Sequence, residues 1–134
     1  MSCYENIALA LTIQKVPAKE IQKRVNDVAE KLGITEILKK YPYQVSGGQK
    51  QRVASARAII TNPKLILADE PTGNLDSVTS HDVLGLLKMA ARQFSQTLIL
   101  ITHDRDIAQL ADRIVHIEDG KIVGDTRKGS DSYA

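Results

Sequence analysis

The sequence predicts an α/β fold in which a helical region leads into a mostly parallel sheet and a closing β-hairpin. Apolar residues at helical spacing run through the N-terminal part of the chain. Two later apolar runs, Leu65–Ala68 and Leu98–Ile101, show no alternation, which is typical of strands buried on both faces of a parallel sheet. Asp119-Gly120 is a strong two-residue hairpin turn between Ile114–Ile117 and Ile122–Val123.

The composition is that of an ordinary globular domain. The chain has 134 residues, of which 43% are hydrophobic and 25% charged, so it suits one domain with a modest core. Its net charge of +2 gives no reason to expect a nucleic acid as partner. The apolar runs are too short to span a bilayer, and residues 1–5 lack the pattern of a signal peptide. The single cysteine, Cys3, excludes an internal disulfide framework and suits a reducing cytoplasm.

Two helices are expected first. Residues 4–12 are rich in alanine and leucine, and a second helix has Pro17 in its first turn and Gly33 as its natural stop. Its apolar residues form one stripe: Ile21, Val25, Val28, Ala29 and Leu32. Basic residues fall mostly on the other side: Lys19, Lys23, Arg24 and Lys31. We interpret them as a solvated face, and contact with a membrane partner is the alternative.

A short helical piece over residues 34–40 is interrupted at Tyr41-Pro42-Tyr43, because proline disfavours helix in the residue before it. We expect Tyr43 to pack against the protein. The next helix starts after Ser46 and runs to about Ile60, with small and apolar residues for packing.

The start of that helix has the features of an anion site. Ser46 and Gln49 have the S-x-x-Q spacing of a capping box, in which each side chain satisfies a free donor at the helix start. Gly47 and Gly48 let the backbone come close to a ligand. A helix N-terminus also carries N–H groups and a positive dipole end, so phosphate is the obvious candidate anion.

A second chemical feature follows the strand Leu65–Ala68. Asp69 and Glu70 come where this strand ends, at the edge where ligands bind in open α/β folds. A carboxylate there can hold magnesium through water, and its neighbour can orient an attacking water or accept its proton. The alternative is a turn with exposed charges.

The remaining chain continues the alternation of helix and strand. A helix is expected over residues 77–94, followed by a strand over Thr97–Thr102. That strand delivers His103 to the sheet edge at which Asp69 lies. The tail from Thr126 is polar.

Four motifs occur in register: Val45–Gln49, Leu65–Glu70, Gly73–Asp76 and His103. In order and spacing they resemble the nucleotide-binding domain of ABC-type ATPases. They match its signature, with Val45 for the usual leucine, then Walker B with the catalytic glutamate, the D-loop and the switch histidine. The resemblance covers nearly the whole chain and implies part of a P-loop NTPase fold. It divides the chain into a helical signature subdomain at 1–62, a core portion at 63–126 and a tail at 127–134.

The resemblance implies a role for each motif. Asp69 would hold magnesium through water, and Glu70 would be the catalytic glutamate. His103 would contact the γ-phosphate of ATP and help to hold the water and Glu70. Asp76 would belong to the D-loop that crosses a dimer interface, and it can also cap the helix that begins beside it.

The signature would act on a second subunit. Ser46 and the backbone N–H groups near Gly47 and Gly48 would contact the γ-phosphate of ATP held by a second ABC ATPase domain docked head to tail, and Gln49 would belong to the same nucleotide-binding site. Closure of the two domains on ATP would drive transmembrane permease subunits. The resemblance thus implies a cytoplasmic ATPase subunit held at the inner face of the cell membrane, closest to the branch that serves lipoprotein release, macrolide export and antimicrobial-peptide resistance.

No stretch of the sequence has the G-x-x-x-x-G-K-[ST] pattern of a phosphate-cradling P-loop. Gly120-Lys121 has Val115 where the pattern requires glycine, and it lies in the expected hairpin. The family places the P-loop N-terminal to the helical region, so we expect the chain to be the C-terminal portion of a cassette. Alone it should bind magnesium-ATP weakly or not at all and should not hydrolyse it. Strands short of neighbours should also favour self-association.

Two other functions remain open from the sequence. Soluble ABC proteins work in DNA repair and translation, although the coiled-coil insertion or tandem cassette typical of them does not occur in this sequence. A non-catalytic module that donates its signature to a complete partner is the other alternative. The transported substrate is beyond the reach of the sequence, because membrane subunits select it.

Overall fold

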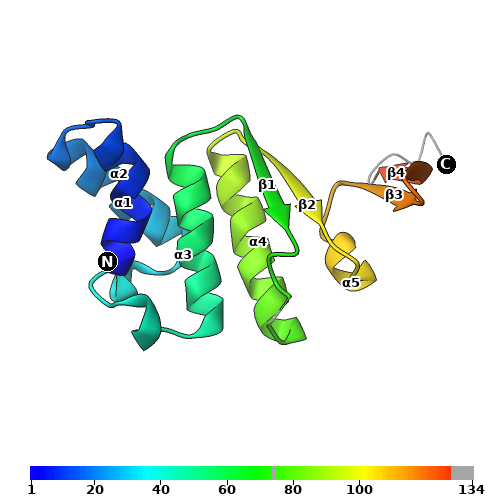
Figure 1. The fold of residues 1–134 in the computed structure, drawn as a ribbon, viewed down its shortest axis with the longest axis horizontal. Coiled ribbons are helices and arrows are strands. Elements are labelled where there is room, and N and C mark those ends of the chain that lie inside the picture. Colours follow the sequence, from blue (N-terminus) through cyan, green and yellow to red (C-terminus); the bar gives the residue numbers. More distant parts are fainter. Residues whose placement is uncertain (74, 128–134) are drawn as a thin grey trace.

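The computed structural model describes residues 1–73 and 75–127. N-terminal helices pack together at one end, a further helix lies between them and a pair of strands, and a hairpin forms the other end (Figure 1). The helices are α1 Cys3–Ile13, α2 Ala18–Leu32, α3 Gly47–Ile60, α4 Ser77–Gln93 and α5 Arg105–Ala108. The strands are β1 Leu65–Asp69, β2 Thr97–Ile101, β3 Arg113–Glu118 and β4 Lys121–Arg127, and 3-10 turns cover Thr35–Ile37 and Pro42–Gln44.

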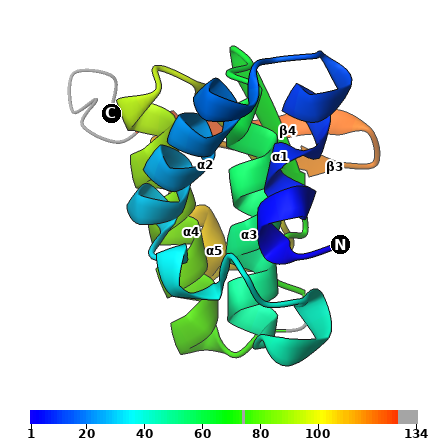
Figure 2. The same ribbon diagram turned by 90° about the vertical axis from the view of Figure 1, so that its left-hand side faces the viewer.

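The bounds and the buried face of α2 follow from its sequence. Pro17 directly precedes the helix, and Gly33 ends it with φ +68°, a left-handed conformation that glycine adopts at little cost. The predicted apolar stripe is buried throughout, with no member more than 7% exposed. It packs among α1, α3 and α4, as the turned view shows (Figure 2). The helix and its core-facing side are therefore confirmed.

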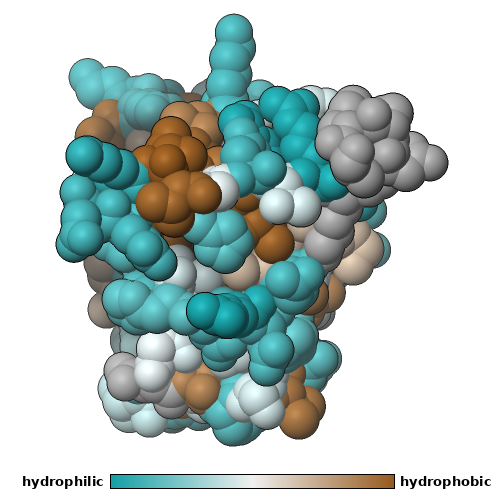
Figure 3. Space-filling view, turned by 90° about the vertical axis from the view of Figure 1, so that its right-hand side faces the viewer, coloured by the Kyte–Doolittle hydropathy of each residue, from teal (hydrophilic) through white to brown (hydrophobic). Residues whose placement is uncertain are grey.

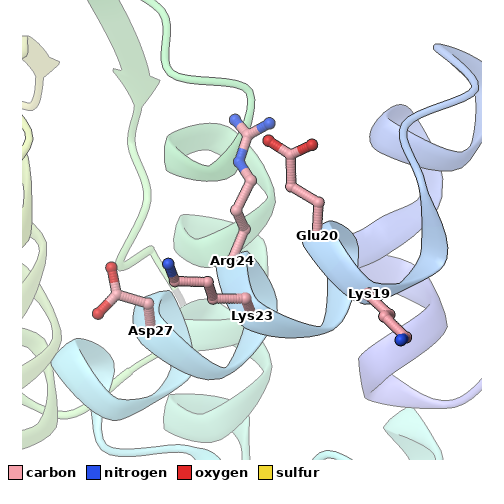
Figure 4. A pocket seen from close by; sticks show the side chains of 5 residues that line it. All are labelled: Lys19, Glu20, Lys23, Arg24 and Asp27. Carbon is pink, nitrogen blue, oxygen red and sulfur yellow. The ribbon is translucent and has the colours of Figure 1, made fainter.

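The charged side of α2 borders an open hollow of about 490 Å³ (Figure 4). Charged residues of both signs line it: Lys19, Glu20, Lys23, Arg24 and Asp27. Arg24 departs from a purely solvated face, because its guanidinium donates a hydrogen bond to the carbonyl oxygen of Ile60, the last residue of α3. It thereby satisfies a carbonyl that the end of a helix leaves without a partner.

The parallel pairing is confirmed between β1 and β2. Leu65 stands opposite Thr97 and Asp69 opposite Ile101, so both strands end at the same edge. The strands β3 and β4 form a separate antiparallel pair around Asp119 and Gly120, both with positive φ. Positive φ at both central residues is the requirement of a type I′ turn, and the predicted two-residue hairpin turn is confirmed.

The expectation that β1 and β2 are buried on both faces is wrong for the described residues. Ile66 is only 5% exposed, but alternate residues are open: Leu65 54%, Leu67 65%, Ile99 45% and Ile101 46%. The reason is that α4 packs against β2 from one side, while no described element covers the opposite face. Apolar patches also appear on the face that carries the hairpin (Figure 3).

The expectation that Tyr43 packs against the protein is also wrong. Its side chain is 80% exposed. The 3-10 turn Pro42–Gln44 turns the ring outward, where it stacks on Tyr41 with ring centroids 5.8 Å apart.

No helix in residues 1–73 or 75–127 is both long enough and apolar enough to cross a membrane.

Candidate functional site

The shared edge of β1 and β2 positions the first group of predicted site residues. Directly after β1, the backbone N–H of Glu70 donates to the carbonyl oxygen of Ile101 at 2.8 Å. Glu70 itself has φ +46°, a left-handed conformation that is unfavourable for a residue with a side chain. The turn brings its carboxylate back across the edge toward the end of β2.

Glu70 and His103, predicted from separate motifs, lie in direct contact. Oε1 of Glu70 accepts a hydrogen bond from the backbone N–H of His103 at 3.0 Å and lies 2.8 Å from Nε2 of its imidazole. The His103 side chain is 94% exposed and that of Glu70 34%. Even a fully charged pair in such an exposed place would contribute at most about 1 kcal/mol to stability. The contact therefore does little for folding, but it sets the direction of both side chains.

Asp69 is the exposed last residue of β1, next to Glu70. Within the described ranges, no group of three or more His, Cys, Asp or Glu side chains could hold a metal ion. That arrangement still suits magnesium, which keeps several waters and takes one or two carboxylates together with phosphate oxygens. Asp69 thus fits as one protein ligand of such an ion.

The start of α3 has the predicted capping box. Ser46 is extended, with φ −69° and ψ 166°, and its Oγ accepts from the N–H of Gln49 at 3.1 Å. Oε1 of Gln49 accepts from the N–H of Ser46 at 2.9 Å. The first N–H groups of any α-helix have no partner inside it, so the turn at Gly47 and Gly48 has the geometry expected of a phosphate contact.

Asp76 caps α4 in the same way. Its Oδ1 accepts from the N–H of Thr79 at 2.8 Å and its Oδ2 from the Thr79 hydroxyl at 3.0 Å. These bonds, led by that from the backbone N–H, lower the pKa of Asp76 below its ordinary value. The predicted D-loop also includes Asn74, which lies outside the described residues.

The structure also brings the predicted signature and the predicted D-loop side by side. A Cβ added at Gly47 would lie 3.2 Å from Cδ2 of Leu75, and one added at Gly48 would lie 2.6 Å from Cγ2 of Thr79. Sequence reasoning missed Thr79. The only local signal was its position three residues after the capping aspartate, which explains its bond to Asp76 but not its contact with Gly48.

The candidate site residues thus fall into two open groups. One is at the ends of β1 and β2, and the other is at the starts of α3 and α4; all four ends point to the lower side of Figure 1. The hollow beside α2 is lined by none of the candidate site residues. A smaller one of about 190 Å³ between α1 and α3 is lined in part by Val45 and Lys50, at the start of α3, but by neither Glu70 nor His103. The site residues line an exposed surface of the chain.

The chain can now be compared with known proteins. Residues 1–73 match the family described as ABC transporter. The putative ABC transporter ATP-binding protein MG467 of Mycoplasma genitalium is 48% identical over 92% of this chain and 39% of its own length. The bacitracin export ATP-binding protein BceA of Halalkalibacterium halodurans is 45% identical over 96% of this chain and 51% of its own length.

Solved structures share the fold. The structure of cbiO1 from Clostridium perfringens, part of the ABC transporter complex cbiONQ, has a TM-score of 0.88 and 31% identity over 94% of this chain and 51% of its own. The dimeric bacterial ABC transporter cassette MJ0796 has a TM-score of 0.77 and 34% identity over 95% and 56%. This chain spans between 39% and 56% of the length of these relatives. Since the family match takes in more than half of its residues and the fold agrees, the chain belongs to the ABC transporter family.

Proposed function

We propose that this chain is part of an ATP-hydrolysing subunit that powers an ABC transporter. The observation that carries the proposal is the contact between Glu70 and His103 at the end of two parallel strands, in a chain that also has a capped signature helix. A partly exposed carboxylate held by an exposed imidazole at a sheet edge is placed to act on a bound ligand rather than to stabilise the fold.

In this function the residues at the sheet edge act on water and phosphate. Glu70 orients the attacking water and accepts its proton. His103 holds the Glu70 carboxylate from the other strand and presents its exposed imidazole to the terminal phosphate. Asp69 is the residue of this chain that would hold magnesium, which when bound neutralises charge on the phosphate oxygens.

The signature acts on a nucleotide bound elsewhere. Ser46, Gly47, Gly48 and Gln49 form a helix start suited to a phosphate. Because residues 1–134 contain no P-loop pattern, we propose that this phosphate belongs to ATP cradled by the P-loop of a second ABC ATPase domain, docked head to tail. The dimeric cassette among the relatives supports this arrangement. Asp76, at the start of the neighbouring helix, belongs to the same interface.

The proposed membrane partners are permease subunits. The relative that is part of a transporter complex supports this partnership. Binding to permease subunits would hold this subunit at the inner face of the membrane. The relative named for bacitracin export supports the antimicrobial-peptide branch of the family. The ABC proteins of DNA repair and translation are not favoured, because the names of the relatives reported above refer to transport.

A mixing experiment tests the signature directly. The partner is a full-length MJ0796-type cassette with an intact P-loop and a disabled signature, and the measured quantity is magnesium-dependent ATP hydrolysis. We expect the 134-residue chain to restore hydrolysis. Ser46→Asn and Ser46→Asp form a matched pair, because both side chains cap a helix well, but only aspartate places a negative charge against the phosphate.

We expect Ser46→Asn to keep part of the restored hydrolysis and Ser46→Asp to lose it by at least about tenfold, the factor that 1.4 kcal/mol of repulsion produces. Equal hydrolysis with both variants would contradict a phosphate contact at Ser46. No restoration by the unmodified chain would contradict the donation of its signature to a second domain.

A further inference from the structure

We propose that Thr79 is a positioning residue that holds the D-loop aspartate Asp76 and the signature glycine Gly48 in one arrangement. One face of its short side chain touches α3, and the other bonds to the residue that caps α4. The proposal rests on the proposed function, in which both segments meet a second domain, but its geometry can be tested without nucleotide.

The contact with Gly48 leaves no room for a side chain. A Cβ built on Gly48 would lie 2.6 Å from Cγ2 of Thr79 and 4.0 Å from Cγ2 of Val83. Real Cβ contacts do not become as short as the first of these distances. The packing of α4 therefore requires a glycine at position 48. This requirement is separate from the close approach of a phosphate, which glycine also permits.

The contact with Asp76 fixes the rotation of the Thr79 side chain. Its hydroxyl donates to Oδ2 of Asp76 at 3.0 Å while its backbone N–H donates to Oδ1 at 2.8 Å. A threonine in a helix has few χ1 rotamers to choose from. A methyl group at position 48 would therefore turn Thr79 away from Gly48 and break the hydroxyl bond to Asp76.

Thr79 thus couples two segments that are far apart in the sequence. Displacement of the signature turn would move Cγ2 of Thr79, and that movement would release one of the two oxygens of Asp76. The starts of α3 and α4 would accordingly approach a partner as one rigid unit. The position of Gly48 would set the orientation of the Asp76 carboxylate. Neither the signature nor the D-loop motif includes Thr79.

The test is a set of substitutions in the 134-residue chain. Gly48→Ala introduces the clash. Adding Thr79→Ser removes the methyl group that clashes and keeps the hydroxyl, whereas adding Thr79→Val keeps a methyl group and removes the hydroxyl. The first measurement is an NMR titration of the Asp76 carboxyl. The second is the thermal unfolding midpoint.

We expect Gly48→Ala to raise the pKa of Asp76 toward its ordinary value and to lower the unfolding midpoint by about 5 °C. Gly48→Ala with Thr79→Ser should recover most of both quantities, and Gly48→Ala with Thr79→Val should recover neither. The coupling would be overturned if the two double variants had the same Asp76 pKa and the same unfolding midpoint. It would also be overturned if the Asp76 titration did not change in Gly48→Ala.

The mixing experiment then separates positioning from mere packing. Thr79→Val alone keeps the contact with Gly48, so its unfolding midpoint should change by less than about 2 °C, while the restored hydrolysis should fall at least about threefold in kcat. Hydrolysis equal to that of the unmodified chain would overturn the positioning role. If the unmodified chain restores none, the proposed function fails, and the titration and unfolding results still decide the coupling.

Discussion

The backbone at Glu70 allows a prediction that runs against the usual effect of glycine. With φ +46°, Glu70 occupies the left-handed region, where a residue with a Cβ loses about 1–2 kcal/mol and glycine does not. At ordinary positions glycine is less favourable than alanine by about 0.5–1 kcal/mol, because it loses more backbone entropy on folding. At position 70 the cost of the left-handed conformation to a residue with a Cβ exceeds the entropy cost of glycine. We therefore expect Glu70→Gly to be more stable than Glu70→Ala by roughly 0.5–1 kcal/mol.

The comparison of these two variants isolates the backbone. Both remove the carboxylate and its contacts with His103, so the loss of those contacts cancels. The measurement is urea unfolding of the chain followed by circular dichroism, with the free energy taken from midpoint and slope. Ala54→Gly is the control, because Ala54 is exposed within α3 and should lose about 1 kcal/mol.

A Glu70→Ala variant as stable as Glu70→Gly, or more stable, would refute the reasoning, provided that Ala54→Gly shows the normal loss. The expected result would mean that the chain retains an unfavourable conformation at Glu70 although glycine would relieve it. Such strain persists at functional sites, where the side chain itself is needed.

Three other predictions concern acid stability, nucleotide binding and association. The hydrogen bonds from Thr79 hold the pKa of Asp76 below its ordinary value in the folded chain. The stabilisation from Asp76 is therefore fully present above the ordinary pKa and is lost as the pH falls through the lower folded pKa. Asp76→Asn should keep the cap and remove this part of the acid dependence, which urea unfolding at several pH values measures. Isothermal titration of the chain with magnesium-ATP should show no micromolar binding, because this sequence has no P-loop pattern, and micromolar binding would disprove the expectation. Light scattering should show self-association of the chain. Leu67→Lys should reduce this association without opening the core, because Leu67 is 65% exposed. An unmodified chain that stays monomeric at high concentration would contradict the prediction.

Features that depend on near neighbours in the chain could be predicted from the sequence. The capping box of Ser46 and Gln49, the left-handed Gly33 and the Asp119-Gly120 turn each satisfy backbone groups within a few residues. The stripe of α2 could be predicted for the same reason, because helical spacing alone decides which side chains share a face.

Features that depend on packing partners could not be predicted. An apolar run such as Leu65–Ala68 indicates a strand but not which of its faces another element covers, and here Leu67 is open. The sequence predicts that Tyr43 packs against the protein, but a 3-10 turn directs its ring outward. In both cases the side chain's burial depends on residues distant in the sequence.

The same distinction between local features and packing partners applies to the candidate site. The sequence by itself predicts which residues would carry the proposed chemistry, because a strand end, a helix cap and a pair of carboxylates are local patterns. Only the tertiary structure decided which of them meet: Glu70 reaches His103 because β1 and β2 pair in register, and Gly48 touches Thr79 because α3 and α4 pack at their starts. These contacts join residues 33 and 31 positions apart, and at such separations only the packed fold sets the distance between two side chains.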